Sequence, residues 1–174
     1  MIRGELVDLR PLTVDDIERS ERLANDPDYN GPFGTWALTA AGDVRRRFEI
    51  DGYLSHEHGR LTVVDKSGEP VGTVSFIAIF HGPPPSNRVY NIGIDIDPAQ
   101  RRRGYGAEAQ ALLARYLFDT YAVERVEAST DVENVPEQRA LERAGFTREG
   151  VLRRAQWRAG DWHDIALYSK LRGE

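Results

Sequence analysis

The sequence Arg101-Arg102-Arg103-Gly104-Tyr105-Gly106 lies between a strand pattern and a helix pattern, and the fold can be worked out from this junction. Residues 89–97 before it alternate apolar and polar side chains, as a half-buried strand does. Residues 106–118 after it carry apolar side chains at the i, i+3, i+4, i+7 and i+8 spacing of an amphipathic helix. Residues 123–130 return to a strand pattern. This order of strand, helix and strand predicts a right-handed parallel crossover.

The same hexapeptide has the chemistry of an anion-binding loop. Backbone N–H groups at the start of a helix concentrate positive potential, and glycines let an anion approach the backbone closely. Arginines add charge-assisted hydrogen bonds to phosphate oxygens. A pyrophosphate would therefore fit over residues 101–106, although a basic, glycine-containing turn on a solvated surface would explain the hexapeptide equally well if it stood alone.

The N-terminal half is predicted to combine two helices with a hairpin. Thr13 resembles a helix N-cap, and the apolar spacing after it predicts a helix that runs to Asn25. A loop rich in Gly and Pro follows, and residues 39–54 have the pattern of a second helix. Strands are expected at residues 4–10, 61–64 and 71–80, the last two forming a hairpin.

The C-terminal half is predicted to end in a helix and a second hairpin. Asn134 resembles an N-cap, with Glu137 in a capping-box relation to it, and Gly145 supplies the left-handed stop. Residues 151–157 and 165–171 are expected to pair as the closing hairpin.

Composition narrows the classes of protein. With 174 residues, 40% of them hydrophobic, the chain can bury one sizeable core, so a single domain over residues 1–174 is expected. The absence of cysteine excludes disulfides, thiolate metal sites and cysteinyl intermediates. A net charge of −5 argues against a nucleic-acid partner and suits a cationic substrate better. No apolar run has the length of a signal peptide or of a membrane span, so we expect a cytoplasmic protein without a membrane partner.

The loop and two further motifs together resemble a known protein family. The pattern Arg101-x-x-Gly104-x-Gly106 resembles the acetyl-CoA signature of the GNAT superfamily of N-acetyltransferases, and residues 134–146 resemble its second motif. Glu149-Gly150-x-Leu152-Arg153 is similar to the branch that acetylates ribosomal proteins. The resemblance, which spans residues 6–171, implies an α/β (α+β) fold. That fold has a mixed central sheet of about six to seven strands, splayed parallel strands at its centre, and about four helices.

The resemblance implies that the chain binds acetyl-CoA or another short acyl-CoA as cosubstrate. The amides of residues 101–106 would hold the CoA pyrophosphate. Ile94 and Ile96 would offer strand backbone to the pantetheine arm, which Asn134 would also bond. The positions expected to contact the cosubstrate are Ile94, Ile96, Arg101, Arg102, Arg103, Gly104, Tyr105, Gly106, Asn134 and Arg139.

The implied reaction is acyl transfer to a primary amine by direct attack in a ternary complex. The acceptor would be a small molecule, an antibiotic or a protein N-terminus. Because amines with pKa values of about 8 to 10 are mostly protonated at pH 7, some group must accept a proton. Asn91 stands where this branch commonly has Glu, and Glu137 stands where it commonly has Ser. The base is therefore left open between Asp95, Glu137 and water held near Asn91.

Other interpretations of these residues remain open. A non-catalytic acyl-CoA sensor would keep the loop and lack a base, as the departures at Asn91 and Glu137 allow. Gly104-x-Gly106-x-x-Ala109 matches a dinucleotide fingerprint, but the repeated alternation of strands and helices is absent. His56-Glu57-His58 has no further ligand cluster, so no metal is expected. Strand-rich ends are compatible with a homodimer. The candidates for a substrate pocket or for packing beneath loops are Trp36, Trp157 and Trp162.

Overall fold

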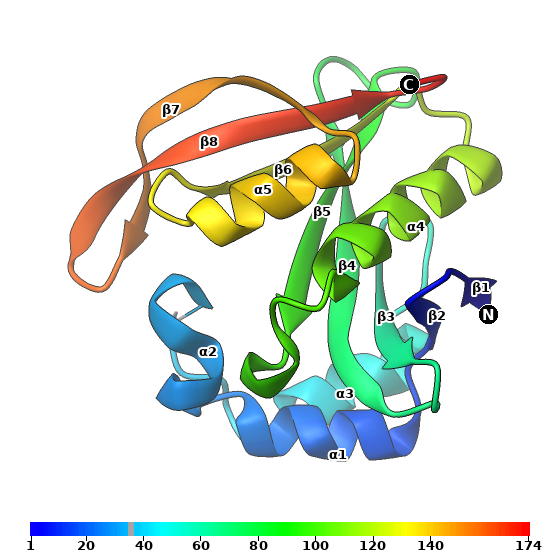
Figure 1. Cartoon of the computed structure of the whole chain (residues 1–174), viewed down its shortest axis with the longest axis vertical. Coiled ribbons are helices and arrows are strands. Elements are labelled where there is room, and N and C mark those ends of the chain that lie inside the picture. Colours follow the sequence, from blue (N-terminus) through cyan, green and yellow to red (C-terminus); the bar gives the residue numbers. More distant parts are fainter. Residues whose placement is uncertain (35–36) are drawn as a thin grey trace.

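A computed structural model of the chain describes residues 1–34 and 37–174, and Trp36 lies outside these described residues (Figure 1). They form one mixed sheet with the strand order β1-β2-β3-β4-β5-β6-β8-β7. The strands are β1 (Ile2–Arg3), β2 (Val7–Pro11), β3 (His58–Asp65), β4 (Pro70–Phe80), β5 (Arg88–Ile96), β6 (Arg125–Asp131), β7 (Thr147–Arg158) and β8 (Asp161–Leu171). The helices are α1 (Val14–Leu23), α2 (Pro27–Gly34), α3 (Asp43–Asp51), α4 (Tyr105–Thr120), α5 (Val135–Arg143) and the short 3-10 helix η1 (Pro98–Gln100).

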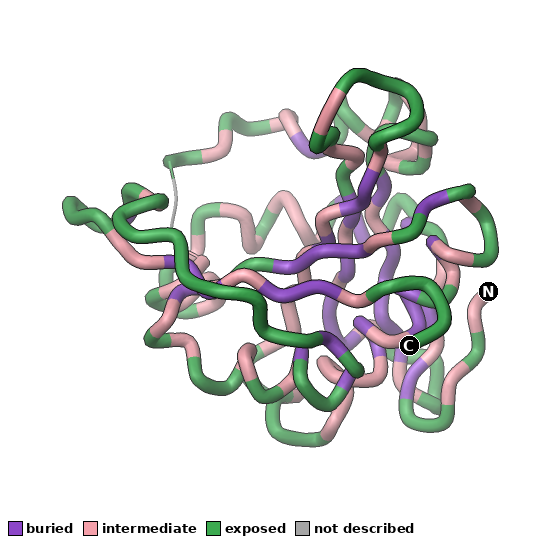
Figure 2. The backbone as a smooth tube through the Cα atoms, turned by 90° about the horizontal axis from the view of Figure 1, so that it is seen from above, coloured by how far each residue is buried: buried purple, intermediate pink, exposed green. Residues whose placement is uncertain are grey.

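Helices cover both faces of the sheet. Figure 1 shows α4 beside α5, and α1 beside α3 in a separate layer. Strand alternation explains the division. Leu61 and Val63 of β3 are buried in the core that contains α4. Thr62 between them points the other way, and its hydroxyl donates to Asp16 of α1 (3.0 Å). Figure 2 shows buried backbone concentrated in the middle of the sheet.

The two central strands separate part-way along their length. β5 and β6 are parallel and pair only over residues 90–92 and 126–128. β5 continues to Ile96 and β6 to Asp131 beyond this pairing. The edge of β5 that faces β6 is therefore left open over residues 93–96, next to the start of α4. The predicted crossover and its splayed strands are confirmed.

The element count differs from the expectation, with eight strands and five α-helices in the described residues. The additional helix, α2, lies in the predicted Gly- and Pro-rich loop. It is kinked at Gly31 (φ 64°, ψ −173°) and contains Pro32, so it has no continuous apolar stripe that a sequence pattern would reveal. The helix expected over residues 39–54 is shorter, from Asp43 to Asp51, because Gly52 adopts a left-handed conformation (φ 66°) that ends it.

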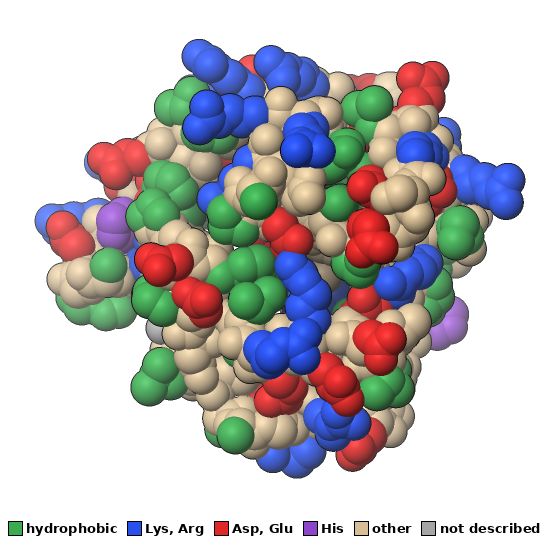
Figure 3. Space-filling view, turned by 60° about the horizontal axis from the view of Figure 1, so that its bottom comes forward, with side chains coloured by type: hydrophobic (Ala, Val, Ile, Leu, Met, Phe, Trp, Pro, Cys, Tyr) green, Lys and Arg blue, Asp and Glu red, His purple; other side chains and the backbone are tan. Residues whose placement is uncertain are grey.

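Charges of both signs are interspersed on the surface that Figure 3 shows, as the sequence indicates. None of the helices in the described residues is long and apolar enough to cross a membrane. The same residues contain no group of three or more His, Asp or Glu side chains that could hold a metal ion.

Candidate cosubstrate cleft and active site

A cleft of about 1090 Å³ occupies the gap between β5 and β6. Its walls come from the ends of these strands, the loop before α4, the first turns of α5, and α2. The predicted site residues that line it are Ile94, Asp95, Ile96, Arg101, Arg102, Gly104, Tyr105, Gly106, Asn134, Glu137 and Arg139. The cleft thus brings together most of the predicted cosubstrate positions and two of the three predicted catalytic positions.

The loop before α4 exposes a helix N-terminus to the cleft. Gly104 is the N-cap in a left-handed conformation (φ 85°), and none of the described side chains caps this end of α4. The first N–H groups of α4 are therefore open to an anion. A side chain at residue 104 would be strained by the positive φ, and its Cβ would lie 3.0 Å from Leu6 Cδ1. Glycine is required here, as the sequence motif indicates.

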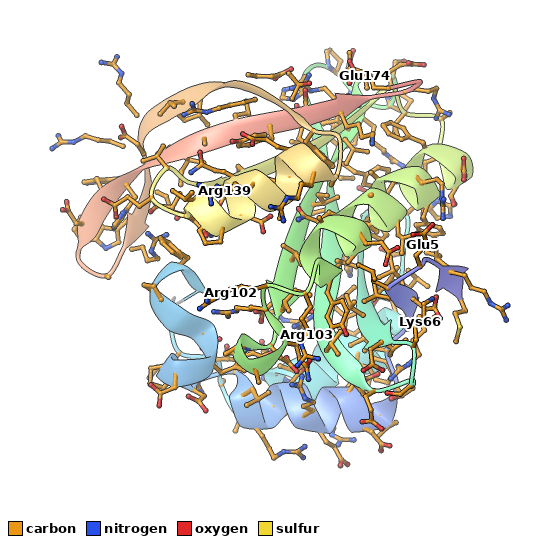
Figure 4. All side chains as sticks on the ribbon, viewed as in Figure 1. Glu5, Lys66, Arg102, Arg103, Arg139 and Glu174 are labelled. Atoms are coloured by element: carbon orange, nitrogen blue, oxygen red, sulfur yellow. The ribbon has the colours of Figure 1, made fainter. Side chains whose placement is uncertain are left out.

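The three arginines of this loop have different roles. The Nε atom of Arg101 donates to the carbonyl of Ile96 (2.9 Å), which ties the loop to the end of β5. Arg102 adopts a positive φ of 63° and lines the cleft, as does Arg139 on α5 (Figure 4). Arg103 leaves the same loop but is not among the described residues that line the cleft.

The first-turn acid of α4 is engaged away from the cleft. The carboxylate of Glu108 accepts hydrogen bonds from three successive backbone N–H groups, those of Glu5 (2.6 Å), Leu6 (2.7 Å) and Val7 (2.7 Å). An acid in the first turn of a helix competes with an anion for the positive end of its dipole. Here the segment between β1 and β2, together with the first residue of β2, binds that acid, so the loop face of α4 stays available to a phosphate.

Asn134 and Glu137 line the cleft from the start of α5. Asn134 Oδ1 accepts from the backbone N–H of Glu137 (3.4 Å), as the predicted N-cap should. Its Nδ2 donates to Thr130 Oγ1 at the end of β6 (3.0 Å). Burial raises the pKa of Glu137 to about 7 from its ordinary value of 4.5, and a hydrogen bond with Gln110 opposes that rise. A carboxyl group with such a pKa can donate or accept a proton near neutral pH.

Asp95 lies on the opposite wall, on the polar face of β5. It lines both the cleft and a second cavity of about 390 Å³ between the sheet and helices α1 and α2. Burial raises the pKa of Asp95, while the charges of Arg60 and Arg101 act against that rise. The two cavities therefore meet at a half-buried carboxyl group.

Asn91 is not brought to the other predicted catalytic residues. It pairs in register with Glu127 of β6, in the part of β5 where the two strands are still joined. Four residues of strand, about 13 Å, separate it from Asp95, and it is not among the described residues that line the cleft. Strand alternation correctly places Asn91 and Asp95 on one face, but it does not fix where along the strand the cleft begins.

A buried ion pair that no sequence motif predicts lies at the far wall of the cleft. The guanidinium of Arg158, at the end of β7, forms an ion pair with the carboxylate of Asp131, and both side chains are almost fully buried. The same guanidinium lies over the ring of Phe33 in α2 (5.4 Å). These three residues are far apart in the sequence and belong to no short motif, so a local pattern cannot reveal them.

The comparisons with known proteins agree with this geometry. Residues 7–147 match the family model described as an acetyltransferase (GNAT) domain. The chain belongs to this family. Over 175 residues, 94% of this chain and 93% of the relative, it is 29% identical to the probable N-acetyltransferase YjcK of Bacillus subtilis (strain 168). The predicted resemblance is confirmed, and the chain is an acetyltransferase.

Two other relatives extend the comparison. A ribosomal-protein-serine acetyltransferase of Escherichia coli (strain K12) is 25% identical over 139 residues, which cover 78% of this chain and 75% of that protein. This similarity agrees with the predicted ribosomal-protein-acetylating branch. The crystal structure of spermidine N-acetyltransferase from Vibrio cholerae in complex with CoA and spermine has a TM-score of 0.81 at 20% identity, over 97% of both chains. At that identity the likeness shows a common fold.

Proposed function

We propose that this chain transfers an acetyl group from acetyl-CoA to a primary amine, by direct attack within a ternary complex. The observation that carries the proposal is the opening between β5 and β6. It joins a helix N-terminus suited to a pyrophosphate with two half-buried carboxyl groups in one cleft. The open edge of β5, residues 93–96, offers backbone groups to an extended amide chain such as pantetheine.

The two carboxyl groups are suited to opposite proton transfers. Asp95 adjoins the second cavity, from which an amine would approach, and although burial raises its pKa, the charges of Arg60 and Arg101 limit that rise. It takes a proton from the amine as the nitrogen attacks the thioester carbon. Glu137 has a pKa of about 7, so it is protonated in a large fraction of molecules at neutral pH. As the carbon–sulfur bond breaks, it gives its proton to the departing sulfur.

Direct attack is favoured because the chain has no cysteine that could carry the acyl group. Mass spectrometry of the protein incubated with acetyl-CoA alone should show no stoichiometric acyl adduct. An adduct on a residue of the cleft would contradict direct attack and replace it with a two-step mechanism.

Release of free CoA in the presence of a panel of primary amines tests the activity itself. Release that depends on both acetyl-CoA and an amine, with the acetylated amine identified by mass, is the expected result. If the protein bound acetyl-CoA but released no CoA with any amine, the sensor interpretation would replace the enzymatic one.

A further inference from the structure

The second cavity is small and opens towards the reaction site. Its volume of about 390 Å³ is near the lower end of the range for small-molecule pockets, roughly 300–1,000 Å³. Asn30, Gly34 and Asp95 line both this cavity and the cosubstrate cleft. A molecule bound in the cavity therefore has one end beside Asp95, next to the cleft, and its other end against the sheet and α1.

Arg60 of β3 lies in this cavity without an acidic partner. Its Nη2 atom donates to Thr73 Oγ1 (3.2 Å), and no carboxylate of the described residues lies within ion-pair distance of it. The other arginine of the cavity, Arg19, is paired with Asp97 (2.5 Å) and lies over the ring of Tyr29. The charge of Asp95 acts on the half-buried guanidinium through space without a direct ion pair, so a carboxylate from a ligand would add charge-assisted hydrogen bonds that Arg60 lacks.

Strand register places Arg60 and Asp95 on the same face of the sheet. Arg60 stands opposite Ser75 of β4, and Ser75 stands opposite Gly93 of β5. In the next row Thr73 stands directly opposite Asp95. Because the guanidinium of Arg60 reaches Thr73, it lies beside the strand next to the one that carries Asp95, and neighbouring strands are about 5 Å apart. This spacing suits a compact molecule that carries an amine and a carboxylate a few bonds apart.

We infer that the acceptor is an amino acid or a similar small zwitterion, with its amine beside Asp95 and its carboxylate on Arg60 and Thr73. The inference rests on the proposed function and narrows its substrate class. A polyamine would bring a second positive charge towards Arg60, and the two cations would repel each other. The cavity therefore selects for a carboxylate as well as for an amine.

Turnover of matched acceptors tests the inference. The probes are glycine and the eighteen standard L-amino acids with a primary α-amine, each paired with its carboxamide, and L-lysine paired with cadaverine, which lacks the carboxylate. Among acceptors that release CoA, the free acid should have a kcat/KM at least about tenfold above its partner. In Arg60→Gln that ratio should fall to near one, whereas Arg45→Gln, which alters an exposed arginine paired with Glu18, should keep it. Equal turnover of acids and their carboxamides by the parent protein would overturn the inference and leave the acetyltransferase function standing.

A binding measurement separates this inference from the proposed reaction. Calorimetry with the N-acetyl forms of the same amino acids, added to the protein with saturating CoA, needs no turnover. At least one N-acetyl amino acid should bind at least about tenfold more tightly than its methyl ester. Arg60→Gln should abolish this difference, and Arg60→Lys should keep part of it. Binding of this kind without CoA release would preserve the carboxylate site on Arg60 and overturn the proposed reaction. Equal binding of acids and esters would overturn the site.

Discussion

The two walls of the cleft surround their carboxyl groups differently. On the α5 wall, Glu137 has the uncharged Gln110 as its hydrogen-bond partner, and burial raises its pKa to about 7. On the β5 wall, burial also raises the pKa of Asp95, but Arg60 and Arg101 oppose the rise. The pKa of both carboxyl groups is raised, but only on the β5 wall do arginine charges act against the effect of burial. In the proposed reaction Glu137 would serve as the proton donor, and Asp95, whose ionised form the two arginines help to maintain, would serve as the acceptor.

The largest effect is expected from a variant that cannot bind CoA, because the carboxyl groups of both walls act only when the cosubstrate is bound. In Gly104→Val the side chain is strained at φ 85° and obstructs the approach of an anion to the start of α4. We expect the Kd for CoA, measured by calorimetry, to rise by about 10² or more. Gly68→Val is a matched control, because Gly68 has the same strain (φ 91°) in the hairpin turn between β3 and β4. Unchanged CoA affinity in folded Gly104→Val would refute the placement of the pyrophosphate.

Removal of the charge on the β5 wall should affect turnover more than binding. With Asp95→Asn we expect kcat to fall by about 10² or more, because no carboxylate then accepts the proton of the amine. The loss of rate at acidic pH should also disappear from the pH–rate profile. CoA affinity should stay within about twofold. Asp119→Asn, which alters an exposed acid of α4, serves as the control. If Asp95→Asn kept the parent rate and profile, Asp95 would not be the base.

Replacement of Glu137, the carboxyl group of the α5 wall, should lower kcat less than replacement of Asp95 does. Its effect should be seen at the opposite end of the pH range. A proton donor with a pKa of about 7 loses its proton as the pH rises, so the donor's contribution fades above neutrality. We expect Glu137→Gln to lower kcat by about tenfold at pH 6.5 and to have little effect at pH 9. If the variant instead lost the decline at acidic pH, Glu137 would be the base, and the assignment of the two walls would be reversed.

The smallest effect is expected on the free energy of unfolding, which should depend on pH through the raised pKa of Glu137. The folded-state pKa of Glu137, about 7, lies above its ordinary value of 4.5, so the folded protein binds this proton more tightly than the unfolded chain. Stability from this group is present below pH 4.5 and is lost as the pH rises to about 7. In urea unfolding, Glu137→Gln should be more stable than the parent at pH 8, by ~2 kcal/mol, and no more stable at pH 4.5. An equal free energy of unfolding at pH 8 would indicate an ordinary pKa.

The helix ends and the crossover between β5 and β6 were predicted well, because short stretches of sequence indicate them. The helix that opens beside the glycines of residues 104–106, the N-cap at Asn134 and the stop at Gly145 are each marked by single residues with capping or backbone preferences that the sequence reveals directly, although α4 begins at Tyr105, one residue before the predicted start. The splayed strands come from the family resemblance, and pairing over only three residues confirms them.

The rest of the site depends on distant residues, which local patterns do not connect. The cavity behind β5 joins Arg60 to Asp95 through the register of three strands, and its far wall contains α2, whose kink at Gly31 hides the helix from periodicity analysis. Alternation along β5 indicates which side chains share a face, but only the end of the β5–β6 pairing decides that Asp95 enters the cleft and Asn91 does not.

The hydrogen bonds from the backbone of residues 5–7 to Glu108 matter for the production of this protein. A shortened N-terminus that starts at Asp8 would leave the carboxylate of Glu108 without its three backbone donors, one turn from the pyrophosphate loop. Such a protein would keep every side chain of the cleft and still bind CoA weakly, because the freed negative charge would repel the phosphates. Purification tags are therefore better placed after Glu174 than in exchange for the first residues.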